Sequence, residues 1–540
     1  MKEPCRNRWM RLGIALLSLW AVSAPGWAAT WQYAVSFDTG KTNKNESRIT
    51  GKAMLWLPPS SKTIRGLLLA DGEISQAESV RRACADNDLG IVALRGLIGT
   101  FRFWADRNHE AENLLTAMNG LAARTAHKEL RRVPWITFGH STGGITCRNI
   151  AYWKPDRVAG VIHYKSGNFH APNTLPPGNS SLAGVPMLVI NGQYETFGPD
   201  NVEQPDDIDK RLDKRYGRET QWIYVRSDIQ KFRERDPNHL ISLMLDLGGD
   251  HFHGSPELWA SAALFIRKTA QRRIPAELPP GDEPVKCLPV RVETGWLSDA
   301  DLKEPRHPPA AYADYTGDKV RAFWHYDREM AETNAAHHAH MNGPQVISSP
   351  IGAWLDDGDG WTFRVKAEWL DSMPDKYGSS LGGKPVGHSG TPFFYRGKTN
   401  EPVEQIGPDT FRLLAPCKKI FIAAVHPGDA RFRATHRWGE LAMPALKGAA
   451  QQIEFPAIPD LKASAGPYEL KAKASGGLPV YYTVEYGPVI VNAGKLVISE
   501  LPVNPPLPIE CAVTATQLGR RTEPAVATAA PVTVTFQLIP

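Results

Sequence analysis

A serine between two glycines is the pattern in this chain best suited to chemistry. Gly139-His140-Ser141-Thr142-Gly143 matches the G-x-S-x-G pattern of a nucleophile elbow, a sharp turn between a strand and a helix that raises a serine hydroxyl above a sheet. Residues 135–138 are rich in β-forming residues, and residues 145–153 can continue as a helix. Side chains at the two glycine positions are expected to collide with the neighbouring strand and helix. The pattern predicts that Ser141 is a nucleophile.

A base and an acid are needed beside that serine, because a hydroxyl is a weak nucleophile at neutral pH. His251 follows a strand-like run in a glycine-rich loop and is the predicted base, with His253 as the alternative. Glu195 follows the buried run 185–191 and is the predicted acid, with Asp200 as the alternative. His140 is not expected to act as the base, because that side chain points away in most such turns.

The elements that must position these residues alternate between strand and helix as far as residue 275. This alternation predicts an α/β fold with a doubly wound, mostly parallel sheet. The strand-like runs are 31–37, 53–57, 65–73, 90–95, 133–138, 158–163, 185–191 and 241–246. The helix-like runs are 75–86, 111–130, 145–153 and 259–272.

Length and composition predict several globular domains. A chain of 540 residues is too long for one core, and 42% hydrophobic with 22% charged residues is ordinary for globular proteins. The net charge of +5 is small and does not indicate nucleic-acid binding.

The N-terminus has the features of a secretory signal. Basic residues precede the apolar run 12–24, and small residues follow it in 26–29, with cleavage expected near Ala28. We expect residues 1–28 to be a signal peptide, which makes the mature protein secreted or periplasmic, without an integral membrane span. An uncleaved anchor is the alternative.

Beyond residue 278 the composition changes twice. Residues 279–285 are rich in proline and acidic residues and are predicted to be a linker after a catalytic domain at 29–278. Residues 286–448 are predicted to form a β-rich accessory domain. Residues 449–540 contain short strand-like runs between Gly/Pro turns, which is typical of a β-sandwich.

The elbow and its partners resemble a known family. GHSTGG on its strand, Gly192-x-x-Glu195 and Gly248-Gly249-Asp250-His251-Phe252 follow in the order serine, acid, histidine. In this respect residues 30–275 resemble the α/β-hydrolases, and the region from the elbow to the closing helix is similar to secreted bacterial esterases of the dienelactone-hydrolase and polyester-depolymerase type. The C-terminal residues resemble bacterial immunoglobulin-like modules, on runs such as 452–456, 475–480 and 514–519.

The resemblance also implies where an oxyanion would bind. In this fold one donor is the backbone N–H of Thr142, directly after the nucleophile. The second donor comes from the loop after the third strand, where we favour Glu73 N–H over Gly72 N–H. Many relatives have His-Gly in this loop, so Asp71 is a departure.

No cofactor is expected, and no metal site is predicted. His337, His338 and His340 form a histidine-rich run, but no carboxylate or cysteine pattern joins it, which favours an exposed helix end. Five cysteines follow the leader, and their spacing does not say which of them pair; they are Cys84, Cys147, Cys287, Cys417 and Cys511.

Together these features predict a secreted serine esterase that cleaves carboxylic esters through Ser141, His251 and Glu195. The appended β domains suggest, by analogy, an acylated polysaccharide or a polyester as the substrate. A serine peptidase with the same triad and a non-catalytic extracellular binding protein are the alternatives. The sequence does not indicate an oligomeric state.

Overall fold

A computed structural model of the chain was obtained. It describes residues 31–42, 48–70, 72–95, 110–166, 181–193, 195, 221–247, 249, 251, 254–339, 341, 347–371, 387–388, 394–397, 401–426, 429, 431–432, 435–444 and 446–540. The predicted signal peptide lies outside these residues.

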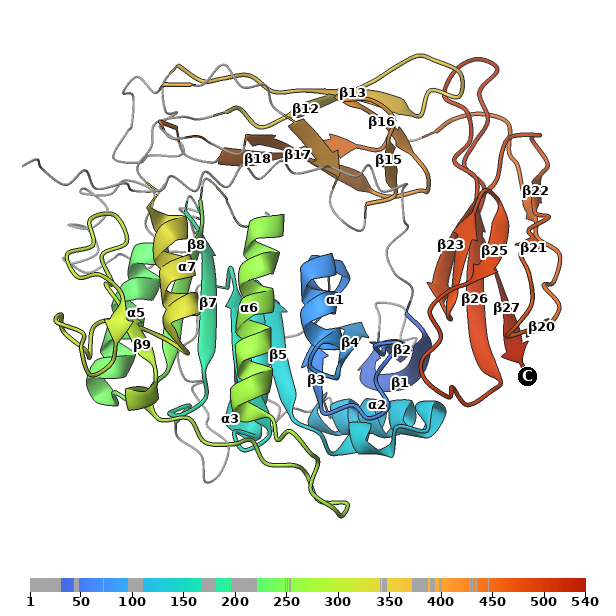
Figure 1. Cartoon of the computed structure of the whole chain (residues 1–540). Helices are drawn as coiled ribbons and strands as arrows, with labels where there is room; N and C mark the ends of the chain where they lie inside the picture. Colours follow the sequence, from blue (N-terminus) through green and yellow to red (C-terminus); the bar gives the residue numbers. More distant parts are fainter. Residues whose placement is uncertain are drawn as a thin grey trace, which may run out of the picture.

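The N-terminal part is an α/β unit built on an eight-stranded sheet (Figure 1). β1 and β2 are antiparallel to their neighbours, and the strands from β3 onward are parallel. The doubly wound, mostly parallel sheet predicted from the sequence is thus confirmed. The strands, in their order across the sheet, are β1 (Tyr33–Thr42), β2 (Arg48–Trp56), β4 (Leu89–Arg95), β3 (Gly66–Leu69), β5 (Trp135–His140), β6 (Val158–Tyr164), β7 (Met187–Gly192) and β8 (Ile241–Asp246).

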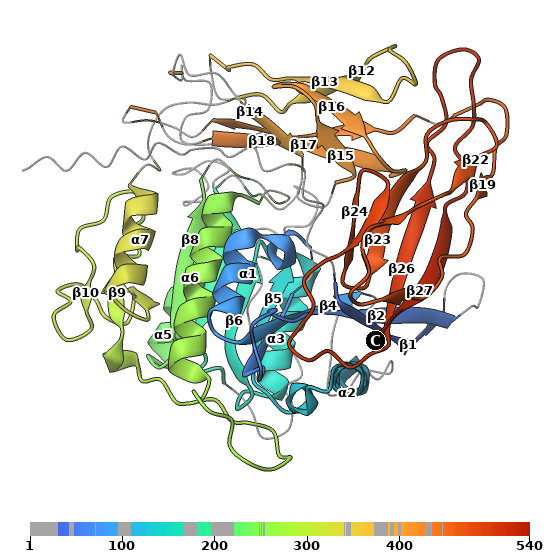
Figure 2. The same ribbon diagram turned by 45° about the vertical axis from the view of Figure 1, so that its right-hand side comes forward.

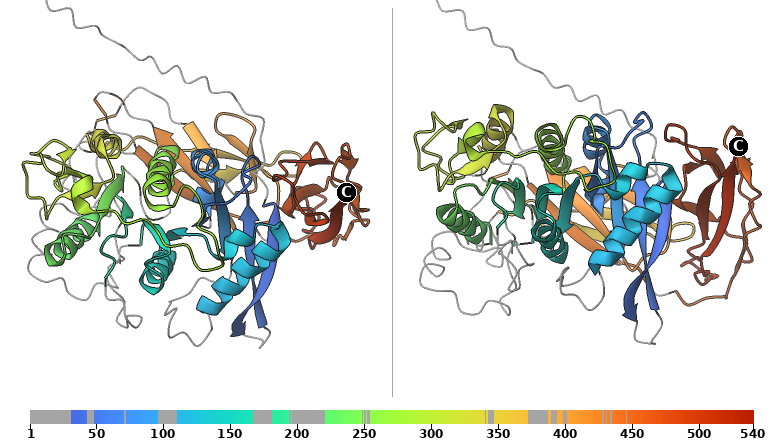
Figure 3. Two further views of the ribbon diagram at one scale, coloured as in Figure 1. Left: turned by 60° about the horizontal axis from the view of Figure 1, so that its bottom comes forward. Right: turned by 90° about the horizontal axis from the view of Figure 1, so that it is seen from below.

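Helices cover both faces of this sheet, as can be followed when the molecule is viewed from below (Figure 3). One face carries α1 (Glu78–Ala85) and α6 (Pro256–Arg273), and the other carries α2 (Glu110–Thr125), α3 (Thr142–Trp153) and α5 (Gln221–Arg235). Short 3-10 helices η1 (Glu73–Gln76) and η2 (Lys128–Arg131) follow β3 and α2.

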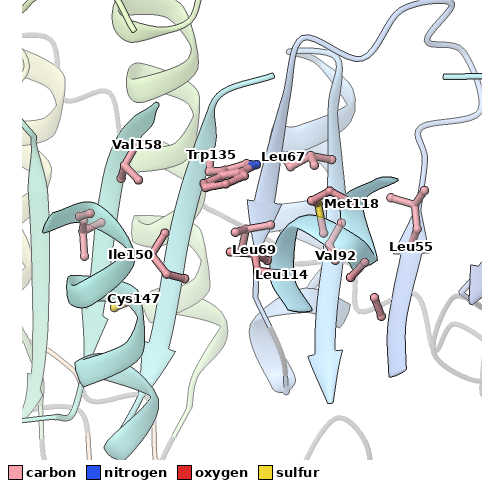
Figure 4. Packing of buried hydrophobic residues seen from close by; sticks show 14 of the residues in the cluster. Leu55, Leu67, Leu69, Val92, Leu114, Met118, Trp135, Cys147, Ile150 and Val158 are labelled. Carbon is pink, nitrogen blue, oxygen red and sulfur yellow. The ribbon is translucent and has the colours of Figure 1, made fainter. Parts of the chain in front are cut away.

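The central strands are buried on both faces, so apolar residues point alternately into two cores. On β5, Trp135 belongs to the core under α2 and α3, and Ile136 to the core under α1 and α6. Figure 4 shows the first of these cores, where Met118 of α2 and Ile150 of α3 pack on the sheet. This packing fixes both ends of the turn between β5 and α3.

Residues 292–338 pack against the same α/β unit. They form η3 (Val292–Thr294), β9 (Trp296–Ser298), β10 (Ala310–Ala311), β11 (Phe323–His325) and α7 (Arg328–His338). Leu297, Trp324 and Met330 share the core of α1 and α6. Composition predicts one accessory domain at 286–448. The first segment of that region, 292–338, packs against the α/β unit.

Helix α7 covers the edge of the eight-stranded sheet at β8, which is the outermost strand of that sheet in the described residues. Its side chains bond to the β8 backbone: Leu245 N–H donates to His338 Nε2 (3.0 Å), His337 Nε2 lies 2.7 Å from Leu245 O, and Asn334 Nδ2 donates to Leu243 O (3.0 Å). Burial lowers the pKa of His338 well below its ordinary value, so the ring stays neutral and accepts. The histidine run was expected to be an exposed helix end, but two of its members bind an edge strand; His340 lies outside the described residues.

Two groups of sheets complete the chain. The middle sheets, residues 351–442, lie across one end of the α/β unit, and the C-terminal sheets, residues 453–539, lie beside β1 and β2 (Figures 1 and 2). Phe363 and Phe411 of one middle sheet, with Trp361 just before β13, share a core with Ile420 and Ile422 of the other sheet.

Within each of these sheets, the strands are named below in the order in which neighbours pair. The middle sheets are β12 (Ile351–Trp354), β13 (Thr362–Lys366), β16 (Thr410–Leu413) and β15 (Val403–Gln405), and then β14 (Phe394–Gly397), β17 (Lys419–His426) and β18 (Thr435–Ala442). The C-terminal sheets are β20 (Leu461–Lys462), β27 (Val532–Ile539), β26 (Ile509–Thr516) and β23 (Tyr481–Tyr486), then β21 (Tyr468–Glu469), β25 (Lys495–Ile498) and β24 (Val489–Asn492), and the pair β19 (Ile453–Glu454) with β22 (Lys473–Ala474).

Cys84, Cys147, Cys287, Cys417 and Cys511 are all in described parts of the chain, and none forms a disulfide there. In the described residues, no helix combines the length and hydropathy needed to cross a membrane.

Candidate active site

Ser141 lies in the turn between β5 and α3, in a backbone conformation that residues other than glycine seldom adopt. Its φ is 55° and its ψ −124°. A Cβ on Gly139 would overlap the carbonyl of Gly143, and a Cβ on Gly144 would overlap Ser166. A Cβ on Gly143 would meet nothing within 4 Å, so the steric reason expected for that glycine is wrong. The turn is strained as an elbow is, and it depends on the first glycine of the motif and on Gly144 just beyond it.

Ser141, His251 and Glu195 come together from three different strand ends. His251 Nε2 lies 2.9 Å from Ser141 Oγ, and His251 Nδ1 lies 2.6 Å from Glu195 Oε1. Glu195 is 1% exposed, whereas the side chain of His251 is 32% exposed. With Glu195 ionised, Nδ1–H donates to it, and Nε2 is left with a lone pair for the serine proton.

The second oxygen of Glu195 is held by its own strand end. Oε2 accepts from the Gly192 N–H at 3.0 Å and from Asn191 Nδ2 at 3.2 Å. The carboxylate is therefore bound at both oxygens, which fixes the direction in which it faces His251. Asn191 was not singled out from the sequence, although its place at the end of a buried strand was visible. The alternatives His253 and Asp200 lie outside the described residues.

His140 supports the loop that carries His251. Its Nε2 lies 2.9 Å from the main-chain oxygen of His251, and the two rings are 5.1 Å apart. Burial is the main cause that lowers the pKa of His140 to about 4. The ring is then neutral at physiological pH and donates its proton to the main-chain oxygen of His251.

Two of the three predicted oxyanion donors, Thr142 and Gly72, line one cavity. Thr142 is the first residue of α3, where backbone N–H groups have no helical acceptor. Gly72 has a φ of 78° and precedes η1. Both residues line a cavity of about 290 Å³, whose other walls include Leu69, Leu94 and Ile150. Glu73 does not line this cavity, and its side chain is buried.

A buried ion pair adjoins the site. Lys165 Nζ, at the end of β6, lies 2.6 Å from Asp246 Oδ2, at the end of β8, and both side chains are buried. His436 of β18 places Nε2 2.8 Å from Asp246 Oδ1, an ion-pair distance without the alignment of a hydrogen bond. None of these three residues was singled out from the sequence. Lys165 and Asp246 could have been noticed there, because each is a charged residue at the end of a buried strand-like run.

Among the described residues there is no group of three or more histidine, cysteine or acidic side chains arranged to hold a metal ion.

Comparisons with known proteins find similar solved structures only. No family model and no curated protein sequence matches the chain. One similar structure is the siderophore hydrolase EstB of Aspergillus nidulans, at 13% identity, covering 43% of this chain and 94% of that chain with a TM-score of 0.27. Another is FphF, a fluorophosphonate-binding serine hydrolase of Staphylococcus aureus, at 10% identity, 44% and 98% coverage and a TM-score of 0.25. A third is the Bacillus cereus carboxylesterase, at 12% identity, 40% and 93% coverage and a TM-score of 0.26.

Proposed function

We propose that this protein is a serine hydrolase that cleaves carboxylic esters. The observation that carries the proposal is the continuous chain of hydrogen bonds from Ser141 through His251 to Glu195, on a turn with the strained backbone of an elbow. A serine, a base that accepts its proton and a buried carboxylate that orients the base are the parts that nucleophilic acyl transfer needs.

In the proposed reaction, Ser141 Oγ attacks the ester carbonyl carbon while its proton passes to His251 Nε2. Glu195 stabilises the imidazolium that forms. The carbonyl oxygen becomes an oxyanion that binds the Thr142 N–H and an N–H of the loop at Gly72 and Glu73. The tetrahedral intermediate then breaks its bond to the alcohol, which leaves with the proton from His251. Water, deprotonated by the same base, attacks the acyl-enzyme and releases the acid and the free serine.

The cavity between Gly72 and Thr142 is the proposed acyl site. Both proposed sources of oxyanion donors border it, and apolar residues such as Leu69, Leu94 and Ile150 form much of its wall. A volume of about 290 Å³ suits a short acyl chain rather than a long one. The polar alcohol part would then face the opening.

The finer assignments rest on the sequence. We propose that residues 1–28 direct secretion or export to the periplasm and that residues 449–540 form an immunoglobulin-like β-sandwich. We further propose an acylated polysaccharide or a polyester as the natural substrate. N-terminal sequencing of the exported protein tests the first point, and sedimentation with insoluble glycans or polyester films tests whether the β domains bind a polymer.

The deciding experiment compares the mature protein with Ser141→Ala on short-chain p-nitrophenyl esters. We expect activity in the parent and none above the solvent rate in the variant, with Ser60→Ala, a change at an exposed serine, as the control. A fluorophosphonate probe should label the parent and the control but not Ser141→Ala. Equal ester hydrolysis by parent and variant would contradict the proposal.

The two alternatives give different results in the same assays. A serine peptidase would accept the fluorophosphonate but prefer amide to ester substrates in matched panels. A non-catalytic binding protein would hydrolyse neither panel and would not be labelled.

A further inference from the structure

One face of a middle sheet is turned toward the candidate active site. In the register of β14, β17 and β18, Arg396 is level with Ala423 and Trp438, and Phe394 is level with Val425 and His436. These two rows are two residues apart, so their side chains lie on the same face of the sheet. His436 reaches Asp246 on this face, so it is the face that contacts the α/β unit.

Arg396 contacts two loops of the α/β unit at once. Its Nη2 donates to the main-chain oxygen of Gly254, three residues after His251. Its Nη1 lies 4.0 Å from Oε1 of Glu73, in the loop after β3. The guanidinium lies over the ring of Trp438, 5.9 Å from its centre. Arg396 thus joins the loop of the base to the loop of the second proposed oxyanion donor.

The Glu73 carboxylate is the centre of this contact. Its side chain is only 6% exposed, and a buried carboxylate is costly unless a cation or hydrogen-bond donors face it. Its Oε2 also borders Gly254 closely, since a Cβ on that glycine would lie 2.6 Å from it. A side chain at position 254 would have to displace the Glu73 carboxylate or the Trp259 ring. The Glu73 carboxylate thus lies against Gly254, with the Arg396 guanidinium in contact with both loops.

The contact of His436 with Asp246 holds the same sheet at a second point. Asp246 ends β8, and its main-chain oxygen accepts from the N–H groups of Gln193 and Gly249 at 3.0 Å each. Because this second point stabilises the docking independently of Arg396, a change at Arg396 need not release the middle sheets.

We propose that Arg396 is a positioning residue for the hydrolase reaction, and that the middle sheets are a structural part of the active site. Arg396 acts through the Glu73 carboxylate and the Gly254 carbonyl: it holds the loop that carries the second oxyanion donor at its working distance from His251. This inference rests on the proposed function. It assigns Arg396 no contact with the substrate.

The test uses full-length protein with Arg396→Met, Arg396→Lys, Glu73→Gln and the double variant Arg396→Met/Glu73→Gln. Glu73→Gln removes the charge but keeps the backbone N–H. Arg364→Met is the matched control, because Arg364 lies on β13 of the outer middle sheet and its side chain is 60% exposed. Rates are expressed per active site, counted by titration with a fluorophosphonate.

We expect Arg396→Met to lower kcat per active site by about tenfold to a hundredfold with little change in KM, because misplaced oxyanion donors weaken the transition state more than the ground state. Arg396→Lys, which keeps the charge, should recover part of this loss. The double variant should be little worse than Arg396→Met, because both changes break one contact. Arg364→Met should match the parent.

Three results would overturn the inference. The first is a normal kcat per titrated site in Arg396→Met with fewer active molecules, which would mean a purely structural role. The second is additive losses in the double variant, and the third is no loss at all. These outcomes are distinct from failure of the proposed function, in which the parent itself shows no Ser141-dependent hydrolysis.

Discussion

Replacing Glu195 by glutamine changes one functional group in a site where every contact of that group is defined. Glu195 accepts at both oxygens, from His251 on one side and from Gly192 and Asn191 on the other. A carboxamide has one acceptor oxygen, and in place of the second oxygen it has an NH2 group that only donates. If its NH2 faces His251, the ring must carry its proton on Nε2 and can no longer accept from Ser141. If its NH2 faces Gly192, two N–H donors oppose each other in a buried place.

The first orientation removes the working tautomer of the base. The second keeps that tautomer but opposes buried N–H donors and removes the negative charge that stabilises the imidazolium, so we expect the first orientation to be favoured. Loss of the correct tautomer in a Ser-His-Asp enzyme lowers kcat by about 10⁴-fold. At about 1.4 kcal/mol for each factor of ten, this is a loss of about 5.5 kcal/mol of transition-state stabilisation. Glu195 is not expected to touch the substrate, so KM should change little. Steady-state hydrolysis of p-nitrophenyl acetate and butyrate measures both constants.

The control is Glu257→Gln, the same chemical change at an exposed position in the first turn of α6. It should leave kcat unchanged. If Glu195→Gln keeps more than about a tenth of the parent kcat while its circular dichroism and melting temperature match the parent, Glu195 does not orient the base. Asp200 would then be the next residue to change.

Three further predictions concern acid stability, the buried ion pair and the acyl site. The pKa of His140 is lowered to about 4 from its ordinary 6.5, so as the pH falls the ring is protonated in the unfolded chain before it is protonated in the folded protein. The free energy of unfolding should therefore decrease by about 3 kcal/mol between pH 6.5 and pH 4. His140→Gln should remove this pH-dependent loss of stability, so the melting temperature of the variant relative to the parent should rise as the pH is lowered from 8 to 4.5. A difference in melting temperature that does not depend on pH would contradict this. Lys165→Met leaves the Asp246 carboxylate buried without its lysine, so urea unfolding should show a loss of about 3–5 kcal/mol, and Lys165→Met/Asp246→Leu should be less unstable than the single variant. Leu94→Trp reduces the cavity, so kcat/KM should fall more for hexanoate than for acetate esters, and an equal fall for both would place the acyl chain elsewhere.

The local parts of the site could be predicted because they are written in short stretches of sequence. The elbow needs a strand, a glycine on each side of a tight turn and a helix, and all of these lie within about fifteen residues. His251 and Glu195 could be chosen because each follows a buried strand, and the carboxyl ends of parallel strands meet at one edge of a sheet. The structure brings these two side chains to Ser141.

The contacts that could not be predicted join residues far apart in the chain. Arg396 and His436 reach loops that precede them by more than 140 residues, and nothing in the local sequence of either strand marks that partner. Lys165 shows the same limit inside the α/β unit. A lysine after a buried strand is typical of a solvated charge, yet this one is buried because Asp246 ends a strand two places away in the sheet.

The limit of the α/β unit could not be predicted from composition either. The proline-rich run at 279–285 is a change of composition, but β8 ends the described sheet, and side chains of a helix beyond that run bond to its backbone. Exposed backbone donors and acceptors at a sheet edge must find partners, and α7 supplies them from residues 328–338. The strand that is closed in this way ends at Asp246, five residues before His251. The position of the proposed base therefore depends on a helix that composition assigns to another domain.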